Sequence, residues 1–360
     1  MNGSTFSSAG FKILFVLLLS WQQTFGQEKP IMCGTSDSDA PQQIKHLMSR
    51  LPAVMASQKA RTAAEEMRLC RIAVDIDSET YVKYDRDTAA IILKVLGNVE
   101  KASKFFEREA NIRMVVTSIR IFKDDGVDPY AGVDNVHPML TVLVNRNLSD
   151  FNFDKRVYLY TKPVFGGASG VAFIGGVYNV SPLEHNGTLM HELGHNFGSY
   201  HSNNCGWPGG PLDYCGGAEG DCYDKSSENS TKGSLMSQCG GTAGQPLHPM
   251  IQAVIKQHAE VNFPKIESKP QSVSLVGDIT AIKGDFYSWP VSLNASSYEF
   301  SYSTDPDFVG ETISTTALNG IHLLKQTRGS DYFVRVKAIN SFGSSEWSNT
   351  IKNQDRPRPA

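Results

Sequence analysis

The sequence has no apolar run long enough to cross a membrane as a helix. A spanning helix needs about 20 apolar residues, whereas the stretch Ile13–Leu19 ends after seven. Runs of lysine or arginine are missing and the formal net charge is −3, so the composition gives no basic surface for nucleic acid. The glycine-rich segment 166–176 lacks the G-x-G-x-x-G order, which disfavours a phosphate-binding loop.

The length of 360 residues exceeds what one hydrophobic core usually serves, so two folded units plus processing segments are expected. In residues 1–26, Lys12 precedes the short apolar run, and Thr24–Gly26 places small residues where a signal peptidase cleaves. We therefore expect a secretory signal and an extracellular protein. A membrane anchor is the alternative, which the shortness of the apolar run disfavours.

Secretion has two chemical consequences. It permits disulfides, and it makes N-x-S/T sequences candidate glycosylation sites. Asn186 also stands where it could be the N-cap of the following helix. The candidate sites begin at Asn147, Asn179, Asn186, Asn229 and Asn294.

The segment His191–His201 reads H-E-x-x-H-x-x-G-x-x-H. His191 and His195 are four residues apart and share one face of a helix. Gly198 can adopt the positive φ that ends a helix, which lets His201 turn back as a third ligand. Three neutral imidazoles leave the fourth corner of a zinc tetrahedron for water, and Glu192 is placed to take a proton from it. A bare H-E-x-x-H also occurs by chance, but the added glycine and third histidine favour one catalytic Zn²⁺ and metal-assisted hydrolysis.

Strands and helices alternate before this motif. Residues 69–77 and 112–122 read as strands, as does 157–161, while periodicity indicates helices over 92–106 and 138–148. The alternation predicts an α/β layer with a mainly parallel sheet. Residues 27–67 are polar, with no stable element before about Gln43, and are interpreted as a short pro-segment. Cleavage near Arg61 would release it, although residues 27–67 contain no dibasic pair.

A glycine-broken strand just before the motif is interpreted as an exposed sheet edge. Such an edge can hold an extended substrate through main-chain hydrogen bonds, and the alternative is an edge without a ligand. The candidate edge residues are Gly170, Val171, Ala172, Phe173, Ile174 and Gly175.

The stretch after His201 is rich in glycine, serine and asparagine and cannot build an apolar core. Its cysteines are expected to form two disulfides with three open pairings, and a second zinc site is disfavoured because no C-x-x-C pair is present. Residues 233–237 place Met236 in a turn, and a helix over 248–262 closes the unit. The four cysteines are Cys205, Cys215, Cys222 and Cys239.

The C-terminal part has a different pattern. Residues 264–269 read as a linker, 270–352 contain short alternating runs typical of a β-sandwich, and 353–360 are expected to be disordered.

The histidine motif together with Met236 resembles the metzincin zinc endopeptidases. The residues H-E-L-G-H-N-F-G within the motif resemble their adamalysin or reprolysin branch. The resemblance covers about residues 68–263. It implies an α/β catalytic domain with a disulfide-rich C-terminal subdomain, zinc bound by His191, His195 and His201, Glu192 as general base, and Met236 beneath the metal. Ser202 departs from the aspartate usual in the adamalysin branch and is similar to matrixins instead.

The segment Pro30–Thr35 resembles the cysteine-switch peptide of adamalysin pro-domains. This resemblance implies that Cys33 occupies the fourth zinc position and keeps the enzyme latent. The alternative is a disulfide between Cys33 and Cys70. Folds of this kind can hold structural Ca²⁺, but the sequence has no clear acidic loop for it.

Residues 270–352 resemble a fibronectin type III module, with Trp289 in an early core strand and Tyr332 at the start of the strand that carries the tyrosine corner. Such a module is a spacer or a binding site for a matrix or cell-surface partner, although an Arg-Gly-Asp sequence is missing.

These features favour a secreted zinc endopeptidase that cleaves extracellular proteins or peptides. The alternative is a catalytically silent binding or adhesion protein that uses the same domain as a scaffold. Intact ligands and an intact base argue against the alternative, and Glu192→Ala separates the two, because only an enzyme loses cleavage while it keeps zinc.

Overall fold

A computed structural model describes residues 33–60, 66–146, 153–213, 219–220, 222, 233–238, 245–281, 284–290, 292, 294–316, 321–324 and 332–353. The signal peptide expected at 1–26, most of the tail expected at 353–360, and the sequons at Asn147 and Asn229 lie outside these residues. No helix in the described ranges combines the length and apolar character needed to span a membrane.

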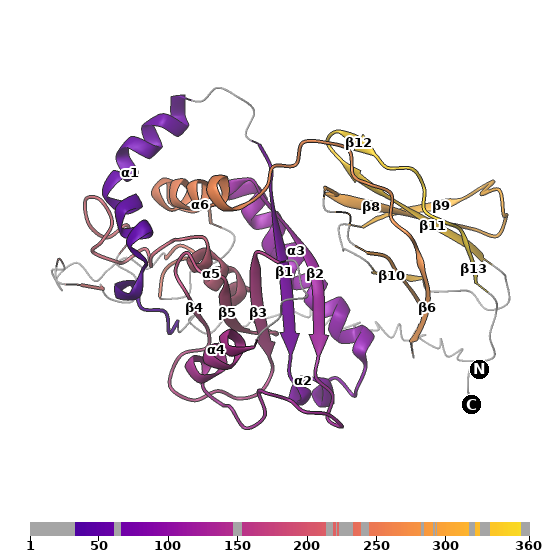
Figure 1. The fold of residues 1–360 in the computed structure, drawn as a ribbon, viewed down its shortest axis with the longest axis horizontal. Coiled ribbons are helices and arrows are strands. Elements are labelled where there is room, and N and C mark those ends of the chain that lie inside the picture. The colour runs from indigo at the N-terminus through magenta and orange to yellow at the C-terminus, as the bar shows by residue number, and fades with distance from the viewer. Residues whose placement is uncertain are drawn as a thin grey trace, which may run out of the picture.

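A five-stranded mixed sheet forms the centre of the first lobe (Figure 1). The strand order is β2-β1-β3-β5-β4, in which β1–β2, β1–β3 and β3–β5 are parallel and β4 is antiparallel to β5. The predicted α/β layer with a mainly parallel sheet is therefore present. The strands are β1 (Arg68–Ile76), β2 (Ile112–Ile121), β3 (Lys155–Tyr160), β4 (Val171–Ala172) and β5 (Tyr178–Pro182).

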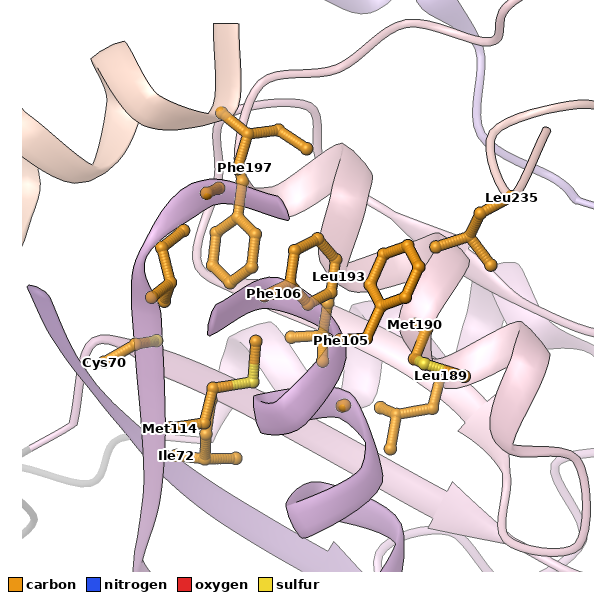
Figure 2. Packing of buried hydrophobic residues seen from close by; sticks show 14 of the residues in the cluster. Cys70, Ile72, Phe105, Phe106, Met114, Leu189, Met190, Leu193, Phe197 and Leu235 are labelled. Atoms are coloured by element: carbon orange, nitrogen blue, oxygen red, sulfur yellow. The ribbon is translucent and has the colours of Figure 1, made fainter. Parts of the chain in front are cut away.

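Helices cover both faces of this sheet because successive strand side chains point to opposite sides. Val157 and Leu159 of β3 join the core formed with α3, α5 and α6, whereas Tyr158 and Tyr160 pack with α4. In the larger core, Phe106 of α3 meets Phe197 edge-on at a centroid distance of 5.0 Å (Figure 2). The helices are α2 (Ser78–Lys83), α3 (Thr88–Ala110), α4 (Val136–Asn145), α5 (Asn186–Asn196) and α6 (Pro249–Asn262).

The strand directly before α5 differs from the sequence prediction. It is β5, an interior strand that the glycine-based interpretation missed, and the edge strand β4 lies before it in the chain. Only Val171 and Ala172 of the predicted edge residues pair in the ladder. Phe173–Gly176 form a turn instead, because Gly175 has φ of 65° and Gly176 N–H donates back to Phe173 O at 2.9 Å.

The expected pro-segment is more structured than its polar composition suggests. It contains a short 3₁₀ turn, Asp37–Asp39, and the helix α1 (Gln42–Ala60), which lies against α6 (Figure 1). Ile44, Met48 and Leu51 recur at helical spacing and are buried in the large core of the first lobe. The segment therefore packs as part of the first lobe.

The expected linker begins later than residue 264. Leu69 N–H donates to Pro264 O at 2.9 Å and Ile266 N–H to Met67 O at 3.0 Å, so this stretch extends the contacts of β1. Ile266 is buried against Leu69 and Val115.

The second lobe is all-β and consists of two antiparallel sheets (Figure 1). Trp289, Tyr298 and Phe300 are central to its separate apolar core. Tyr332 begins β11, as the sequence indicates. One sheet contains β6 (Val276–Ala281), β7 (Gly284–Ser288) and β10 (Ile321–Leu324), and the other contains β8 (Ser297–Ser303), β9 (Thr312–Thr316), β11 (Tyr332–Asn340), β12 (Gly343–Ser344) and β13 (Ile351–Asn353).

Candidate functional site

The helix α5 carries the first two histidines and ends in the turn that the spacing predicts. Gly198 has φ of 92°, its N–H donates to His195 O at 2.8 Å, and Ser199 N–H donates to Gly194 O at 3.1 Å. These two bonds form the Schellman motif that closes a helix at a left-handed residue. The chain then reverses and brings His201 back to the Nε2 side of His195.

The three imidazoles converge on one buried point. His195 Nε2 lies 3.1 Å from His191 Nε2 and 3.2 Å from His201 Nε2, and all three side chains are fully buried. Nitrogen ligands at the usual zinc distance in a tetrahedral site are about 3.3 Å apart. His195 Nε2 therefore lies at the spacing of a tetrahedral ligand set from each of the other two Nε2 atoms.

The outer nitrogens of two of these rings determine where their protons lie. His191 Nδ1 is 2.7 Å from Leu235 O and His195 Nδ1 is 2.8 Å from Ser199 O. A carbonyl oxygen only accepts, so each Nδ1 donates and each Nε2 keeps a lone pair. Burial lowers the pKa of His191 to about 3 and that of His195 well below its ordinary value, so both rings are neutral. Facing lone pairs fit a cation between them, and the donor set suits zinc.

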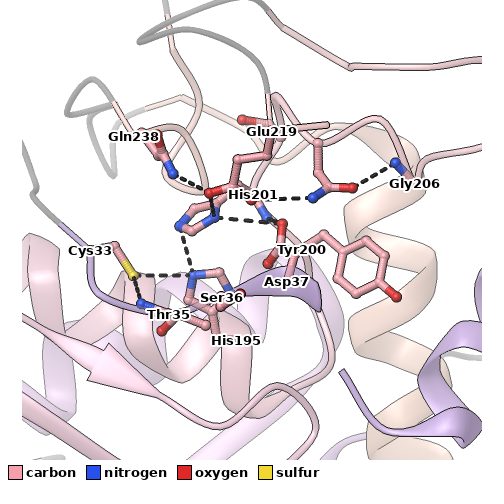
Figure 3. Close-up of polar contacts among 12 residues, drawn as sticks. Cys33, Thr35, Ser36, Asp37, His195, Tyr200, His201, Gly206, Glu219 and Gln238 are labelled. Carbon is pink, nitrogen blue, oxygen red and sulfur yellow. Dashed lines mark hydrogen bonds and ion pairs between the residues drawn. The ribbon is translucent and has the colours of Figure 1, made fainter. Parts of the chain in front are cut away.

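Beside its Nδ1, His201 has two carboxylates where the other two rings have a backbone carbonyl (Figure 3). Its Nδ1 lies 3.0 Å from Glu219 Oε1 and 3.6 Å from Asp37 Oδ2. Burial by itself lowers the pKa of His201, but its contacts with Asp37, Cys33 and Glu219 together raise that pKa well above the ordinary value. Neither carboxylate was predicted from the sequence, because each belongs to a segment that only the folded chain brings to this ring.

Glu192 lies beside His191 on α5 and is fully buried. Its Oε2 is 3.2 Å from Thr35 Oγ1 and 3.6 Å from Cys33 Sγ, which places the carboxylate at the edge of the histidine cluster. A Cβ added at Gly170 would lie 2.5 Å from Glu192 Oε1, so the glycine leaves space for this side chain. Burial raises the pKa of Glu192 to about 8, and a pKa near neutrality suits a group that both accepts and returns a proton.

Cys33 completes a four-residue cluster that could hold a metal ion. Its Sγ is 3.6 Å from His195 Nε2, and the ligand atoms of Cys33 and the three histidines lie within 4.8 Å of one another. Cys33 and Cys70 are both free, so the alternative of a disulfide between them is wrong. Cys70 is instead buried in the sheet core. Burial, followed by the Glu192 carboxylate, raises the pKa of the Cys33 thiol to about 12.

The residues after Cys33 lie along the sheet edge. Gly34 N–H donates to Gly170 O at 2.8 Å. Thr35 Oγ1 accepts from Ala172 N–H at 2.9 Å and is 3.2 Å from both Ala172 O and Glu192 Oε2. One threonine hydroxyl therefore contacts the edge strand and the Glu192 carboxylate together, a contact that sequence reasoning missed.

Lys155 is a second residue that the sequence did not single out. It is almost fully buried at the start of β3. Its Nζ donates to Gly176 O at 2.7 Å and to Asn196 O at 3.0 Å. The ammonium thus ties the turn after β4 to the C-terminal end of α5, where a positive charge stabilises the helix dipole.

Met236 lies against Gly194, near the C-terminal end of α5. It is fully buried, and a Cβ added at Gly194 would lie 2.3 Å from its sulfur. The preceding Leu235 supplies the carbonyl that holds His191. Ser202 connects to the same turn, because its N–H donates to Met236 O at 2.9 Å and its Oγ is 2.9 Å from Ser237 Oγ.

Gly194→Ala is expected to destabilise the protein by about 1–3 kcal/mol, because the new methyl group overpacks the buried Met236. Urea unfolding of the full-length chain measures the effect. Gly97→Ala is the matched control, since Gly97 also lies inside a helix but its Cβ would meet nothing within 4 Å. The control should gain up to about 1 kcal/mol from helix propensity. A Gly194→Ala protein as stable as the control would contradict the packing argument.

The predictions for disulfides and glycans have different outcomes. Cys205 and Cys222 form a disulfide, while Cys215 and Cys239 lie outside the described residues. Asn179 is fully buried and its Nδ2 donates to Asn196 Oδ1 at 2.6 Å, so the prediction of a glycan there is wrong for this fold.

Two other sequons lie within the described residues. Asn186 is the first residue of α5, and the N-cap position belongs to His185, so the N-cap alternative is also wrong. Asn294 is half-buried, and its Nδ2 donates to Ser268 Oγ at 3.0 Å.

One comparison with known proteins identifies a family for this lobe. The family model Reprolysin_5, described as metallo-peptidase family M12, matches residues 66–247, about half of the chain. A comparison with curated proteins gives no match. Among solved structures, a chain of "Structure of a chaperone-substrate complex" is similar with a TM-score of 0.35 and 14% identity, over 55% of this chain and 36% of that chain. This chain thus spans about a third of that chain's length (36%), and the likeness supports no functional argument.

The family match includes the whole histidine motif, the Met236 turn and the disulfide. Members of such a family act on proteins or peptides, which agrees with a buried cluster of three imidazoles beside a carboxylate. The chain therefore belongs to metallo-peptidase family M12 and carries a metzincin-like metallopeptidase domain.

Proposed function

We propose that the protein is a secreted, zinc-dependent endopeptidase of the adamalysin-like branch, latent until its pro-segment is displaced. The convergence of three Nε2 atoms and the Glu192 carboxylate at one buried point carries the proposal. Membership of family M12 supports the reaction class.

The residues have separate roles in peptide hydrolysis. His191, His195 and His201 would hold the zinc, which would supply a Lewis acid for the scissile carbonyl and lower the pKa of water. Glu192 acts as general base, takes the proton of the attacking water and returns it to the leaving amine. Met236 packs beneath the cluster and fixes the position of α5.

The edge strand β4 holds the substrate. A peptide in extended conformation can pair with the N–H and C=O of Ala172 and with the C=O of Gly170, the groups that now contact Thr35 and Gly34. Substrate and pro-segment therefore compete for one surface. The working edge is shorter than the six residues 170–175 expected from the sequence, because the ladder ends at Ala172.

Latency follows from two contacts of the pro-segment. Cys33 would be the fourth residue that holds the zinc and would lose its proton on binding it, since soft sulfur is a good zinc ligand. Thr35 covers Glu192 and the edge strand. Helix α1 adds apolar burial that keeps both residues in place.

The remaining segments have roles outside catalysis. Residues 1–26 act as a secretory signal and 27–67 as the removable pro-segment. The β-sandwich is a fibronectin type III module that serves as a spacer or contacts a matrix or cell-surface partner. The apolar core around Trp289 and the two antiparallel sheets support this assignment.

A cleavage-site profile tests the proposal. The secreted chain, freed of its pro-segment by limited proteolysis, is incubated with a proteome-derived peptide library, with and without a zinc chelator. The active enzyme should produce new termini that vanish with chelator and in the Glu192→Ala protein. A processed chain that holds one zinc per molecule and cuts no peptide would favour the scaffold role instead.

A further inference from the structure

The third histidine of the motif differs from the other two in what holds its outer nitrogen. His191 and His195 each donate Nδ1–H to a backbone carbonyl, whereas His201 Nδ1 lies at ion-pair distance from Glu219 Oε1 (3.0 Å) and Asp37 Oδ2 (3.6 Å), without the geometry of a hydrogen bond to either. A histidine ligand relies on such an outer acceptor, which fixes the tautomer and the ring orientation. The candidate acceptors beside His201 Nδ1 are therefore side-chain carboxylates.

We propose that Glu219 is the positioning residue of the third metal ligand, accepting the Nδ1 proton of His201 so that Nε2 faces the metal. The role rests on the proposed function, because it concerns the same metal centre. Glu219 lies inside the region 66–247 that matches the family model, whereas Asp37 belongs to the pro-segment. Asp37 also has a different task, since its Oδ2 accepts the backbone N–H of His201 at 3.0 Å.

Glu219 is held against His201 by the backbone that follows the motif. Its carbonyl accepts Cys205 N–H at 2.9 Å and its N–H donates to Asn203 O at 3.2 Å, which forms a short parallel bridge. Asn204 Nδ2 donates to its Oε2 at 3.2 Å, and Gln238 Nε2 contacts Oε1 (Figure 3). The carboxylate is thus fixed on both oxygens.

The disulfide Cys205–Cys222 closes the loop that carries this carboxylate. Cys205 donates to Glu219 directly, and Cys222 follows three positions later, with Gly220 packed on Cys205. The segment after the motif has few apolar residues, so a covalent bond replaces core packing as the restraint. The disulfide therefore acts on the metal centre through Glu219.

Zinc affinity of the full-length protein tests the role. Competition with a chromophoric chelator should give a dissociation constant about 10–100-fold weaker for Glu219→Gln, because a neutral amide oxygen accepts the Nδ1 proton more weakly than a carboxylate and the amide can turn its NH2 toward Nδ1 instead. The zinc dissociation constant of Asp37→Asn should stay within about twofold of wild type, because Asp37 accepts the backbone N–H of His201 and does not orient the ring. Glu346→Gln, the same change at an exposed glutamate, controls for charge and should leave affinity unchanged. The visible spectrum of the cobalt-substituted protein should shift only in Glu219→Gln.

A double-mutant cycle tests the route through the disulfide and does not depend on one variant. Cys205→Ser/Cys222→Ser should weaken zinc binding, and adding Glu219→Gln should weaken it little further, because both changes remove the same restraint. Fully additive losses would show a general structural role and overturn the proposal. Should Glu219→Gln fail to fold, an unchanged zinc affinity in the serine variant with Glu219 intact would overturn it as well.

The wild-type protein separates this inference from the proposed function. If wild type binds one zinc and cleaves peptides while Glu219→Gln has the same zinc affinity and cobalt spectrum, only the role of Glu219 fails. If wild type binds no zinc, the proposed function and the inference fail together. Equal losses in Asp37→Asn and Glu219→Gln would also overturn the assignment to Glu219.

Discussion

Glu192→Gln is expected to lower kcat/KM for peptide hydrolysis by about 10²–10⁴-fold, the usual contribution of general acid–base catalysis. Glutamine has nearly the same shape, so the three histidines keep their positions and zinc content should remain one per molecule. The amide cannot accept a proton from water, and that step is lost. A fluorogenic peptide assay on processed protein measures the rate, and elemental analysis of the same sample measures zinc.

The stability of this variant distinguishes lost chemistry from lost structure. Glu192 is fully buried and its Oε1 has no hydrogen-bond partner among the described residues. A buried neutral amide costs less desolvation free energy than a buried ionised carboxylate. The melting temperature of Glu192→Gln should therefore be no lower than that of wild type. Glu346→Gln is the exposed control and should keep full activity. Activity of Glu192→Gln within tenfold of wild type, with zinc intact, would show that another group removes the proton.

The sequence predicts the ligands because their geometry is local. The i, i+4 spacing of His191 and His195 and the glycine three residues later fix relative positions within one helix and its Schellman turn. The residues that support these ligands could not be predicted in this way. Asp37 and Glu219 are 164 and 18 positions from His201 in the sequence, and no periodic pattern marks either one.

The fold shows the same division. The sequence predicts β1 to within one residue at each end and predicts α3 as a helix that is four residues short at each end, because each has one continuous apolar face. The sequence does not predict the short strand β5, and it predicts more residues for β4 than the two that pair. Strands of two to five residues have too little alternation to assign register. Helix α1 mixes polar residues with apolar ones, and the burial of Ile44, Met48 and Leu51 depends on a core that includes α6, which is distant in the chain.

Cys33→Ala is expected to make the full-length protein active without processing. In the present arrangement the thiol lies within ligand distance of the histidine cluster and the following residues cover Glu192. Loss of one ligand worth about 2.8 kcal/mol would raise the fraction of open molecules about 100-fold. Thr35 and α1 still hold the segment, so activity should remain below that of the fully processed enzyme. A fluorogenic peptide assay on intact chains, confirmed by mass, measures the increase.

Cys70→Ala is the matched control for this change, because Cys70 is the other free cysteine and is buried in the sheet core away from the cluster. It should cost some stability by leaving a small cavity but should keep the chain latent. Activation by both substitutions would mean that general loosening, rather than loss of the sulfur, opens the site. A Cys33→Ala chain as latent as wild type would remove the thiol from the mechanism and leave Thr35, through its contacts with Ala172 and Glu192, as the part of the pro-segment that blocks the cleft.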